Sequence, residues 1–504
     1  MFKSLEYSQK VKINQTKTAK IVAKIDRLQG LLIVLPASPG SKIINDLPYA
    51  DVINKRLYRH DKPSNNAIGL TTELPNTLGT HCIVTLVDDS ISSFDLLTLA
   101  RKMATSSLDH KAKTIGIQTL GLDETLATRM VEALTTALLS ASCPLPHFKN
   151  KGEQPEPIQR IEISANTQGL NLKRLRAEVE GNHLTRWLSI LPPNKLTPKI
   201  YRQLISKMAK QQGWQMEFLD QDKLKQRKAG AFLAVAQGSN ERDAGIVHLR
   251  YRPTRMSKSS KPIALVGKGI CFDTGGVNLK PARYMLGMHE DMQGSAVALG
   301  SLLALTRSGF NQPVDCWLAL AQNHIGPAAY KPNDVVHASN GTSIEIIHTD
   351  AEGRMVLADT LALASKQKPR LIIDYATLTG TCMQALGSNY SGLFSNRESL
   401  YPDLIKNGKN CGERVWPFPM DKDYDSALDS KVADIKQCTL DGDADHILAA
   451  RFLNRFIAHD TPWIHIDLSA SNHKGGLAHI PSDTTGFGVR YTLHLLYNKE
   501  IKLI

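Results

Sequence analysis

The stretch HTDAEGRMVLADTLALASKQKPRLIIDYATL, residues 348–378, places three charged side chains directly before a long apolar run. Within it, GRMVLADTLALASKQ (353–367) has the apolar spacing of a buried helix, and PRLIIDYATL (369–378) has the short apolar run of a buried strand. A helix followed closely by such a strand is typical of an α/β domain with a parallel sheet. Asp350, Glu352 and Arg354 then lie at the edge of a core, where charges are costly unless they are paired or bind a metal.

The same alternation of strands and helices extends away from this stretch. Strands are expected at KPIALVGKGI (261–270), VDCWLALA (314–321) and TSIEII (342–347), and a helix at SAVALGSLLALTRSG (295–309). We therefore expect a mainly parallel sheet with helices on both faces. Ligands bind such sheets at the carboxyl ends of the strands. Both GKGICFDTGG (267–276) and HTDAEGR follow a predicted strand, so both segments are candidates for a binding site.

The first third of the chain reads as a separate, smaller α/β unit. Buried strands are expected at GLLIVLP (30–36) and HCIVTLV (81–87), and an amphipathic helix at 123–141. A helical stretch at 172–191 then ends in LPPNKLTP, because proline disfavours helix at and before its own position. These patterns predict an N-terminal domain over 1–165, a connecting helix or linker over 166–191, and a C-terminal domain over 192–504.

The composition is that of a large globular protein with a basic balance. The chain has 504 residues, 42% of them hydrophobic, which is enough to bury the cores of two domains. The formal net charge is +13, but we find no dense Lys/Arg block, only short runs such as RMSKSSKP (255–262). Most of this charge is expected on solvated surface, with nucleic-acid contact as the alternative.

The cysteines and the apolar runs predict the cellular location. The seven cysteines form no CxxC pair and lack the spacing of a disulfide framework. The first residues, MFKSLEYSQKVKI, carry no apolar signal core, and no apolar run approaches the ~20 residues of a membrane helix. We therefore expect reduced thiols and a soluble, cytoplasmic protein that makes no membrane contact.

The charged residues predict a metal site with two ions. Residues 267–294 carry Lys268, Asp273, Lys280 and Asp291, and residues 348–355 add Asp350, Glu352 and Arg354. Four carboxylates brought together would repel strongly unless protons or metal ions offset their charge. Two divalent ions match four carboxylates, and shared carboxylates are usual in dinuclear hydrolases. A set of loop salt bridges is the alternative, which is weaker for seven residues than for any one of them.

These motifs, in this order, resemble the leucyl aminopeptidase family, the cytosol-type dizinc metallopeptidases. The matching segments are HTDAEGRM, GKGICFDTGGVNLKP (267–281), Met288 to Met292, YATLTG (375–380) and TTGFGVR (484–490). The resemblance covers about 192–504. It implies a smaller, macro-like N-terminal α/β domain and a larger C-terminal catalytic domain, whose mixed, mainly parallel sheet is flanked by helices and carries a dinuclear metal site. It also implies a homohexamer built as a dimer of trimers.

The resemblance also assigns roles at the matching positions. It implies the metal ligands Lys268, Asp273, Asp291, Asp350 and Glu352, which would hold two divalent ions, Zn²⁺ or Mn²⁺. It implies Lys280 and Arg354 as the catalytic pair, with a bicarbonate ion on Arg354 as the proton shuttle. It implies Met288, Thr377, Leu378 and Gly380 as substrate-binding residues. The implied reaction removes N-terminal residues, loosely Leu-like, from peptides through a bridging water activated by both metals.

Two other functions stay open at this point. One is a nucleic-acid-binding protein of the same fold that uses its basic surface, with or without peptidase activity. The other is a dinuclear phosphoesterase, which is weaker because such sites usually recruit several histidines.

Several residues depart from the family pattern or imitate other motifs. His348 stands where the family usually has Asn, and we expect it to hydrogen-bond near Asp350. HIDLSAS (465–471) replaces the usual HxDIAG, so substrate preference stays open. Within this segment, we interpret His465 and Asp467 as a satisfied buried pair and not as a metal site. DGDADH (441–446) resembles the start of an EF-hand loop but lacks its Gly at the sixth position, so we interpret it as a solvated turn.

Overall fold

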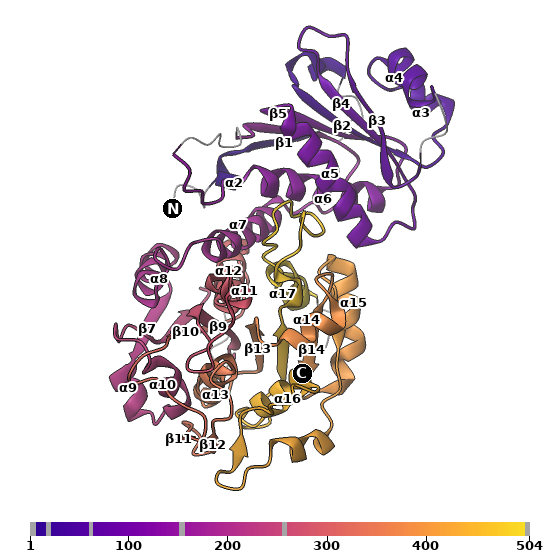
Figure 1. The fold of residues 1–504 in the computed structure, drawn as a ribbon. Helices are drawn as coiled ribbons and strands as arrows, with labels where there is room; N and C mark the ends of the chain where they lie inside the picture. Colours follow the sequence, from indigo (N-terminus) through magenta and orange to yellow (C-terminus); the bar gives the residue numbers. More distant parts are fainter. Residues whose placement is uncertain (1–6, 17–21, 60–63, 151–156, 255–259, 499–504) are drawn as a thin grey trace. The chain divides into compact units, whose positions relative to one another are not determined.

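The computed structural model describes residues 7–16, 22–59, 64–150, 157–254 and 260–498, and it divides the chain into two compact units (Figure 1). Unit 1 comprises Met1–His183, Lys409–Gly412 and Lys474–Thr485, and unit 2 comprises Leu184–Gly408, Glu413–His473 and Gly486–Ile504. The expected α/β class with two domains is confirmed. Most of the basic run RMSKSSKP lies outside the described residues.

Unit 1 is built on a six-stranded sheet in the order β1-β6-β5-β2-β4-β3. Its strands are β1 (Lys12–Thr16), β2 (Gly30–Pro36), β3 (Ala67–Glu73), β4 (His81–Val87), β5 (Thr114–Thr119) and β6 (Arg160–Ser164). Its helices are α2 (Tyr7–Lys10), α3 (Ser41–Asn45), α4 (Ala50–Leu57), α5 (Ser93–Asp109) and α6 (Glu124–Ser142). All strand pairs are parallel except β3 with β4.

The central strand β2 is apolar throughout because both faces of this sheet are covered. Leu32 and Val34 belong to a core with residues of α5 and α6. Leu31 and Ile33 point the other way, into a core with residues of α3 and α4. A strand covered on both faces reads as a continuous apolar run, which is why GLLIVLP was predicted with its correct bounds.

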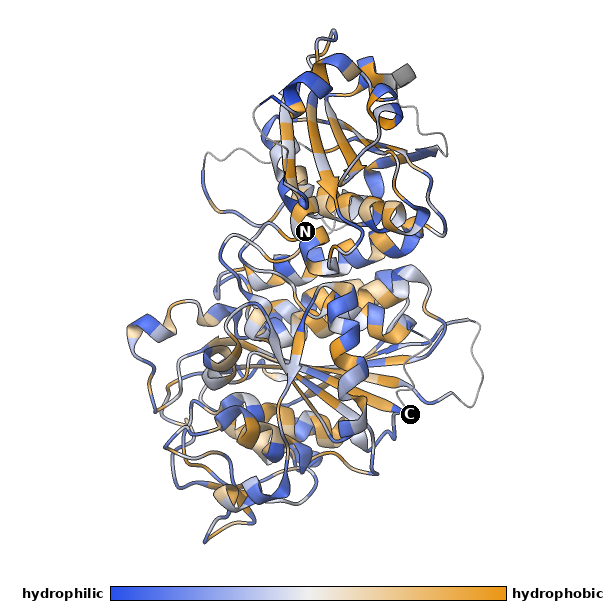
Figure 2. Cartoon of the chain, turned by 90° about the vertical axis from the view of Figure 1, so that its right-hand side faces the viewer, coloured by the Kyte–Doolittle hydropathy of each residue, from blue (hydrophilic) through white to orange (hydrophobic). Residues whose placement is uncertain are grey.

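Unit 2 is built on an eight-stranded sheet in the order β15-β14-β17-β13-β9-β10-β8-β7. Its strands are β7 (Gln215–Asp220), β8 (Gly245–Tyr251), β9 (Ile263–Asp273), β10 (Val314–Asn323), β13 (Leu371–Ala376), β14 (Ser391–Ser395), β15 (Val415–Pro417) and β17 (Trp463–Asp467). The four central strands β17, β13, β9 and β10 pair in parallel. Nearly all of their residues are buried, and hydrophobic (orange) strand segments are visible inside this unit in Figure 2.

Two long helices cover opposite faces of these central strands. Helix α13 (Glu352–Ser365) shares a core with Ala264 and Val266 of β9. Helix α12 (Gln293–Ser308) packs on the other face, where its Gly294 lies against β13. A Cβ on Gly294 would lie 2.1 Å from the carbonyl oxygen of Tyr375, so only glycine permits this approach.

Most of the remaining helices belong to unit 2, but α7 and α15 each have residues in both units. They are α7 (Leu172–Ser189), α8 (Pro198–Gln212), α9 (Gln221–Gln226), α10 (Gly230–Ala236), α11 (Ala282–Met285), α14 (Gly380–Leu386), α15 (Tyr401–Cys411), α16 (Asp445–Asn454) and α17 (Val489–Tyr497). None of the helices in the described part of the chain combines the length and hydrophobicity needed to span a membrane.

The strand predicted at 342–347 does not join the main sheet. It is shortened to β12 (Ser343–Glu345) and lies in a three-stranded sheet between β11 (Val335–His337) and β16 (Ile435–Lys436). The HTDAEGR segment therefore enters the core from this small sheet. By contrast, β9 runs to Asp273 and not only to the predicted residue 270, because its pairing with β10 continues past a bulge and sets Asp273 opposite Asn323.

Candidate metal centre

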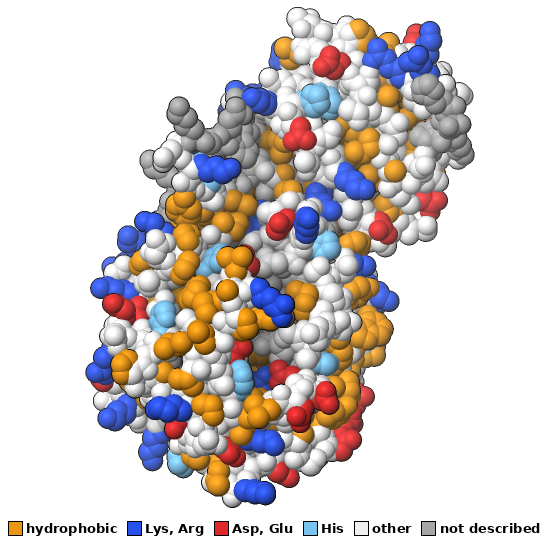
Figure 3. All heavy atoms as spheres, viewed as in Figure 1, with side chains coloured by type: hydrophobic (Ala, Val, Ile, Leu, Met, Phe, Trp, Pro, Cys, Tyr) orange, Lys and Arg blue, Asp and Glu red, His pale blue; other side chains and the backbone are white. Residues whose placement is uncertain are grey.

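A cavity of about 850 Å³ lies beyond the carboxyl ends of β9, β13 and β17, where the first turn of α13 also begins. On the face of unit 2 seen in Figure 3, hydrophobic side chains gather around a hollow that contains charged groups. The cavity is lined by all eleven predicted site residues: Lys268, Asp273, Lys280, Met288, Asp291, Asp350, Glu352, Arg354, Thr377, Leu378 and Gly380. Segments far apart in the sequence thus meet at one place.

Lys268 is the buried cation at the centre of this cavity. It alternates with Gly267 and Gly269 on β9, so its side chain points towards α13 and away from α12. Its Nζ lies 2.6 Å from Asp291 Oδ1, 3.1 Å from Glu352 Oε1 and 2.8 Å from the carbonyl oxygen of Thr377. Burial disfavours the ammonium form, but the surrounding carboxylates outweigh burial and hold the Lys268 pKa above its ordinary value.

The first turn of α13 rests on the stem of that lysine. A Cβ on Gly353 would lie 2.6 Å from Cε of Lys268, so glycine allows the helix to begin directly over the side chain. This close approach places Glu352, the first residue of α13, beside the lysine nitrogen.

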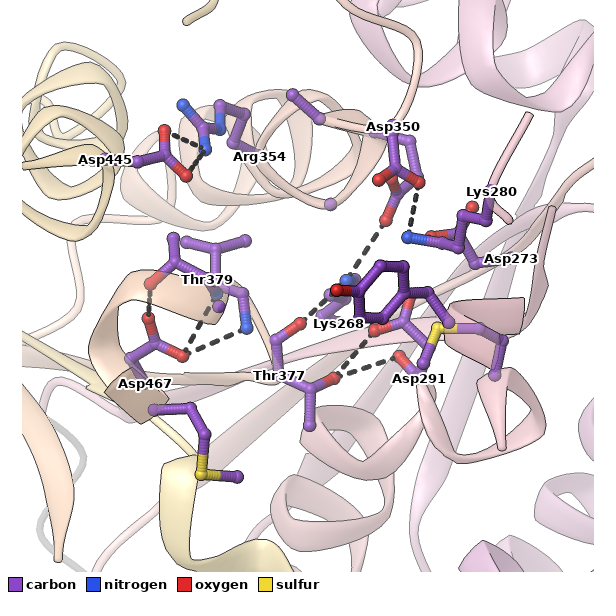
Figure 4. A pocket seen from close by; sticks show the side chains of 18 of the residues that line it. Lys268, Asp273, Lys280, Asp291, Asp350, Arg354, Thr377, Thr379, Asp445 and Asp467 are labelled. Carbon is purple, nitrogen blue, oxygen red and sulfur yellow. Dashed lines mark hydrogen bonds and ion pairs between the residues drawn. The ribbon is translucent and has the colours of Figure 1, made fainter. Parts of the chain in front are cut away.

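Lys280 is the second cation, and it returns to the cavity after a glycine-rich turn. The amide of Gly275 donates to Asp273 Oδ1 at 2.8 Å, and the amide of Lys280 donates to Thr274 O at 2.9 Å, which closes the turn. The Lys280 ammonium lies 3.0 Å from Asp273 Oδ2 and also pairs with Asp350 Oδ1 (Figure 4).

The carboxylates are arranged as ligands for cations. Asp273, Asp350 and Glu352 each offer an oxygen atom within 4.8 Å of the others. Asp291 Oδ2 and Glu352 Oε2 are buried and have no hydrogen-bond partner among the described residues. Buried carboxylate oxygens are costly when unpaired. The donor set, of hard oxygens with one amine nitrogen, therefore fits divalent metal ions.

The pKa values of these acids show how strongly negative charge is crowded here. Burial, helped by the Asp273 carboxylate and opposed by Lys268, raises the pKa of Asp291 to about 8 and those of Asp350 and Glu352 to about 6 each. Two lysines thus leave an excess of negative charge, which divalent cations would remove.

Neutral groups hold the HTDAEGR segment in place. Asn323 Nδ2 donates to Asp273 Oδ1 at 2.8 Å and to the carbonyl oxygen of Thr349 at 3.0 Å, and Tyr330 donates to the same carbonyl at 2.7 Å. The amide of Asp350 donates to Nδ1 of His348 at 3.2 Å, so the expected hydrogen bond of His348 near Asp350 is confirmed. Neither Asn323 nor Tyr330 is predicted from the sequence, although Asn323 ends an apolar strand opposite Asp273.

Both terminal nitrogens of Arg354 are engaged by groups of this chain, whereas its buried Nε has no hydrogen-bond partner among the described residues. Its Nη2 donates to Oδ1 and Oδ2 of Asp445 at 2.7 and 2.9 Å, and its Nη1 donates to the carbonyl oxygen of Gln437 at 3.0 Å. Although burial opposes the charged form, Asp445 and its neighbours raise the pKa of Arg354. Interpreting DGDADH as a solvated turn was therefore wrong for Asp445, which lines the cavity.

Asp467 shapes the wall opposite the carboxylates. It accepts the amide of Leu378 at 3.0 Å and the hydroxyl of Thr379 at 2.6 Å, so it fixes the segment that leads into α14. His465 is also buried, but it pairs with Asp374 at 2.6 Å and not with Asp467, so interpreting those two residues as one pair was wrong. An acid at the carboxyl end of a buried strand is the sequence signal that would have marked Asp467 as a site residue.

The comparisons with known proteins agree with this site. A sequence model described as the cytosol aminopeptidase family, catalytic domain, matches residues 183–493. A probable cytosol aminopeptidase of Wolbachia pipientis wMel is 40% identical over 349 residues, 68% of this chain and 69% of that protein. Another, from Syntrophotalea carbinolica, is 38% identical over 381 residues, 73% of this chain and 75% of that protein.

A solved structure supports the same assignment along almost the whole chain. A mutant of tomato leucine aminopeptidase superposes with a TM-score of 0.83 at 26% identity, covering 97% of this chain and 96% of that one. The chain therefore belongs to the cytosol aminopeptidase family and is a metal-dependent aminopeptidase, a hydrolase.

Proposed function

We propose that this enzyme removes N-terminal residues from peptides at a centre of two divalent metal ions, Zn²⁺ or Mn²⁺. The observation that carries the proposal is the set of buried carboxylates with unpaired oxygen atoms around Lys268. Asp273 and Glu352 lie in the middle of the cluster and suit a shared position between the ions. Lys268 and Asp291 would complete one ion's ligands, and Asp350 the other's.

Each charged side chain then has a separate task. When bound, two such ions supply a water that is acidic enough to attack near neutral pH, and positive charge for the carbonyl oxygen. Lys268 can bind a metal ion only as the neutral amine, so loading the site must displace its proton. Lys280 stays an ammonium whose donors face the cavity, where they stabilise negative charge that develops on the substrate.

The apolar part of the cavity supports a loose preference for Leu-like residues. Met288 and the segment from Thr377 to Gly380 line it. Three further lining side chains are well exposed, namely Leu279 (53%), Met383 (40%) and Leu440 (75%). An apolar surface of this kind discriminates weakly, because one methylene is worth only ~1–3 kcal/mol.

The experiment combines activity with metal content. Release of leucine from leucyl p-nitroanilide should stop in a chelator and return on reloading with Zn²⁺, Mn²⁺ or Co²⁺. Asp350→Ala should lower activity at least ~100-fold and reduce bound metal. Asp89→Ala, an exposed acid of unit 1, is the matched control and should leave both unchanged. Wild-type protein that holds two metals yet releases no leucine from any substrate would disprove the proposal.

The finer expectations from sequence are separate proposals. Family membership favours the peptidase over the nucleic-acid alternative, and a gel-shift titration across salt distinguishes them, because phosphate contacts weaken steeply with salt. The homohexamer is tested by light scattering. A cytoplasmic location is supported by the seven buried cysteines, none of which forms a disulfide, and fractionation of cells tests it.

A further inference from the structure

The guanidinium of Arg354 is already occupied by a carboxylate of this chain. Both oxygen atoms of Asp445 accept from Nη2, and the Gln437 carbonyl accepts from Nη1. The Arg354 side chain is only 3% exposed, whereas that of Asp445 is 23% exposed and borders the cavity. Arg354 is therefore the buried member of this ion pair, and the Asp445 carboxylate is the member nearer to solvent.

The position of Asp445 is fixed by its element. Asp445 is the first residue of α16, where the helix dipole favours a negative charge. The next residue, His446, donates its amide to Thr381 Oγ1 at 3.1 Å, and its ring contacts the same oxygen at 3.0 Å. The start of α16 is thus tied to α14, and the carboxylate is held in place beside Arg354.

A carboxylate and a bicarbonate ion offer an arginine similar hydrogen-bond acceptors. Each is planar, carries one negative charge and offers two oxygens from one carbon, the arrangement that a guanidinium recognises best. Two such anions cannot both take the same donors of Arg354. The resemblance to the family implies bicarbonate at this arginine, whereas in this chain Asp445 holds the position.

We propose that Asp445 is a built-in anion for Arg354, so that this enzyme works without added bicarbonate. The inference rests on the proposed peptidase function and concerns how its site is regulated by anions. Asp445 is a positioning residue, because it acts through Arg354. Its removal would leave a buried guanidinium without a partner charge and so open a position for a planar anion from solution.

The test measures leucyl p-nitroanilide hydrolysis in carbon dioxide-free buffer, with and without bicarbonate. The wild type should change less than about twofold, whereas Asp445→Ala should lose at least about tenfold without bicarbonate and recover most of it with bicarbonate or formate. Asp443→Ala removes an exposed acid two residues away and is the matched control. Asp445→Asn keeps the side-chain shape and should show the same dependence if the alanine variant fails to fold.

A binding measurement provides a readout that does not depend on activity. Line broadening of ¹³C-bicarbonate in NMR should appear with Asp445→Ala and be absent with the wild type. It should vanish again in the double variant Asp445→Ala, Arg354→Ala.

Bicarbonate activation of the wild type by tenfold or more would overturn the inference, as would an Asp445→Ala enzyme that keeps full activity or that no planar anion restores. A wild type that is inactive with metals bound would instead disprove the proposed function, and the binding comparison would still decide the role of Asp445.

Discussion

Asn323 shows how a single uncharged side chain can position a carboxylate of the proposed metal centre. It ends β10 opposite Asp273, and its amide donates to that carboxylate at 2.8 Å and to Thr349 O at 3.0 Å. The amide thereby joins the end of β9 to the HTDAEGR segment. As a neutral donor it orients Asp273 without reducing the negative charge that attracts the metals.

We predict that Asn323→Ala weakens metal binding about 10- to 100-fold. One oxygen of Asp273 then keeps only the amide of Gly275 as partner, and the side chain can rotate out of place. Activity measured against metal concentration should show a deficit that shrinks as metal is added. Asn410→Ala, at an exposed position of α15, should behave as wild type. Equal metal affinity in both variants would show that Asn323 has no positioning role.

Residues within contiguous motifs could be predicted, and residues brought in by folding could not. Lys268 and Asp273 lie on β9, and Asp350 and Glu352 lie in one short motif, so the resemblance of the two motifs to the family brings all four residues to one site. Parallel topology alone does not, because the second motif follows β12 of the small sheet. Asn323 is 50 residues from Asp273, and Asp445 is 91 residues from Arg354. No local pattern encodes such a separation, which is why Asp445 looked like part of a solvated turn.

At the scale of elements, α13 links the site to the core. All of its residues are buried, and its first turn carries Glu352 and Arg354. Asp359, near its middle, accepts the amides of Phe232 at 2.8 Å and Ser339 at 2.6 Å, and so ties α13 to the start of α10. Burial raises the pKa of Asp359 to about 6, although these hydrogen bonds oppose the rise.

This raised pKa predicts a pH dependence of stability with a definite sign. Because the folded protein holds the Asp359 proton more tightly than the unfolded chain does, the contribution is complete below pH ~4 and is lost as pH rises through about 6. Relative to Asp359→Asn, the wild-type free energy of unfolding should fall by about 1 kcal/mol between pH 5 and pH 7.

Urea unfolding of both metal-loaded proteins measures this difference, and other titrating groups cancel in it. A difference that is flat with pH, or that rises, would mean that Asp359 is ionised throughout this range.

Local periodicity located these elements well but did not decide which sheet they join. The helix predicted at 353–367 is α13 (Glu352–Ser365), and the strand predicted at 369–378 is β13 (Leu371–Ala376). The strand predicted at 342–347 became β12 in a separate small sheet, because its partners are β11 and β16. Pairing between distant strands is a property of the whole fold and leaves little trace in a short window.

At the scale of the whole molecule, two α/β units were predictable, and their full membership was not. The proposed boundaries at 165 and 192 stay a prediction. Unit 1 also includes two short segments from late in the chain, Lys409–Gly412 and Lys474–Thr485. Linker-like composition in the sequence does not reveal these two segments, because no change in composition marks their ends.

The cysteines offer a test of the whole packed molecule. All seven are buried and none forms a disulfide, and they are distributed over both units: Cys82, Cys143, Cys271, Cys316, Cys382, Cys411 and Cys438. Burial raises the pKa of the Cys82 thiol to about 12, and it also raises the pKa values of Cys271, Cys316 and Cys382. A thiol reacts as its thiolate, so these groups should be inert while the fold is intact.

We therefore predict that the native enzyme reacts with Ellman's reagent at least about 100-fold more slowly than the unfolded chain, which should titrate seven thiols. Labelling should then follow local or global opening of the fold, so urea concentrations that leave the enzyme folded should barely accelerate it. A single fast thiol in the native enzyme would contradict the burial of that cysteine. Cys438 lines the cavity, but it too is buried, and burial raises the pKa of its thiol. The protection of Cys438 therefore also predicts that mild thiol oxidants leave aminopeptidase activity intact.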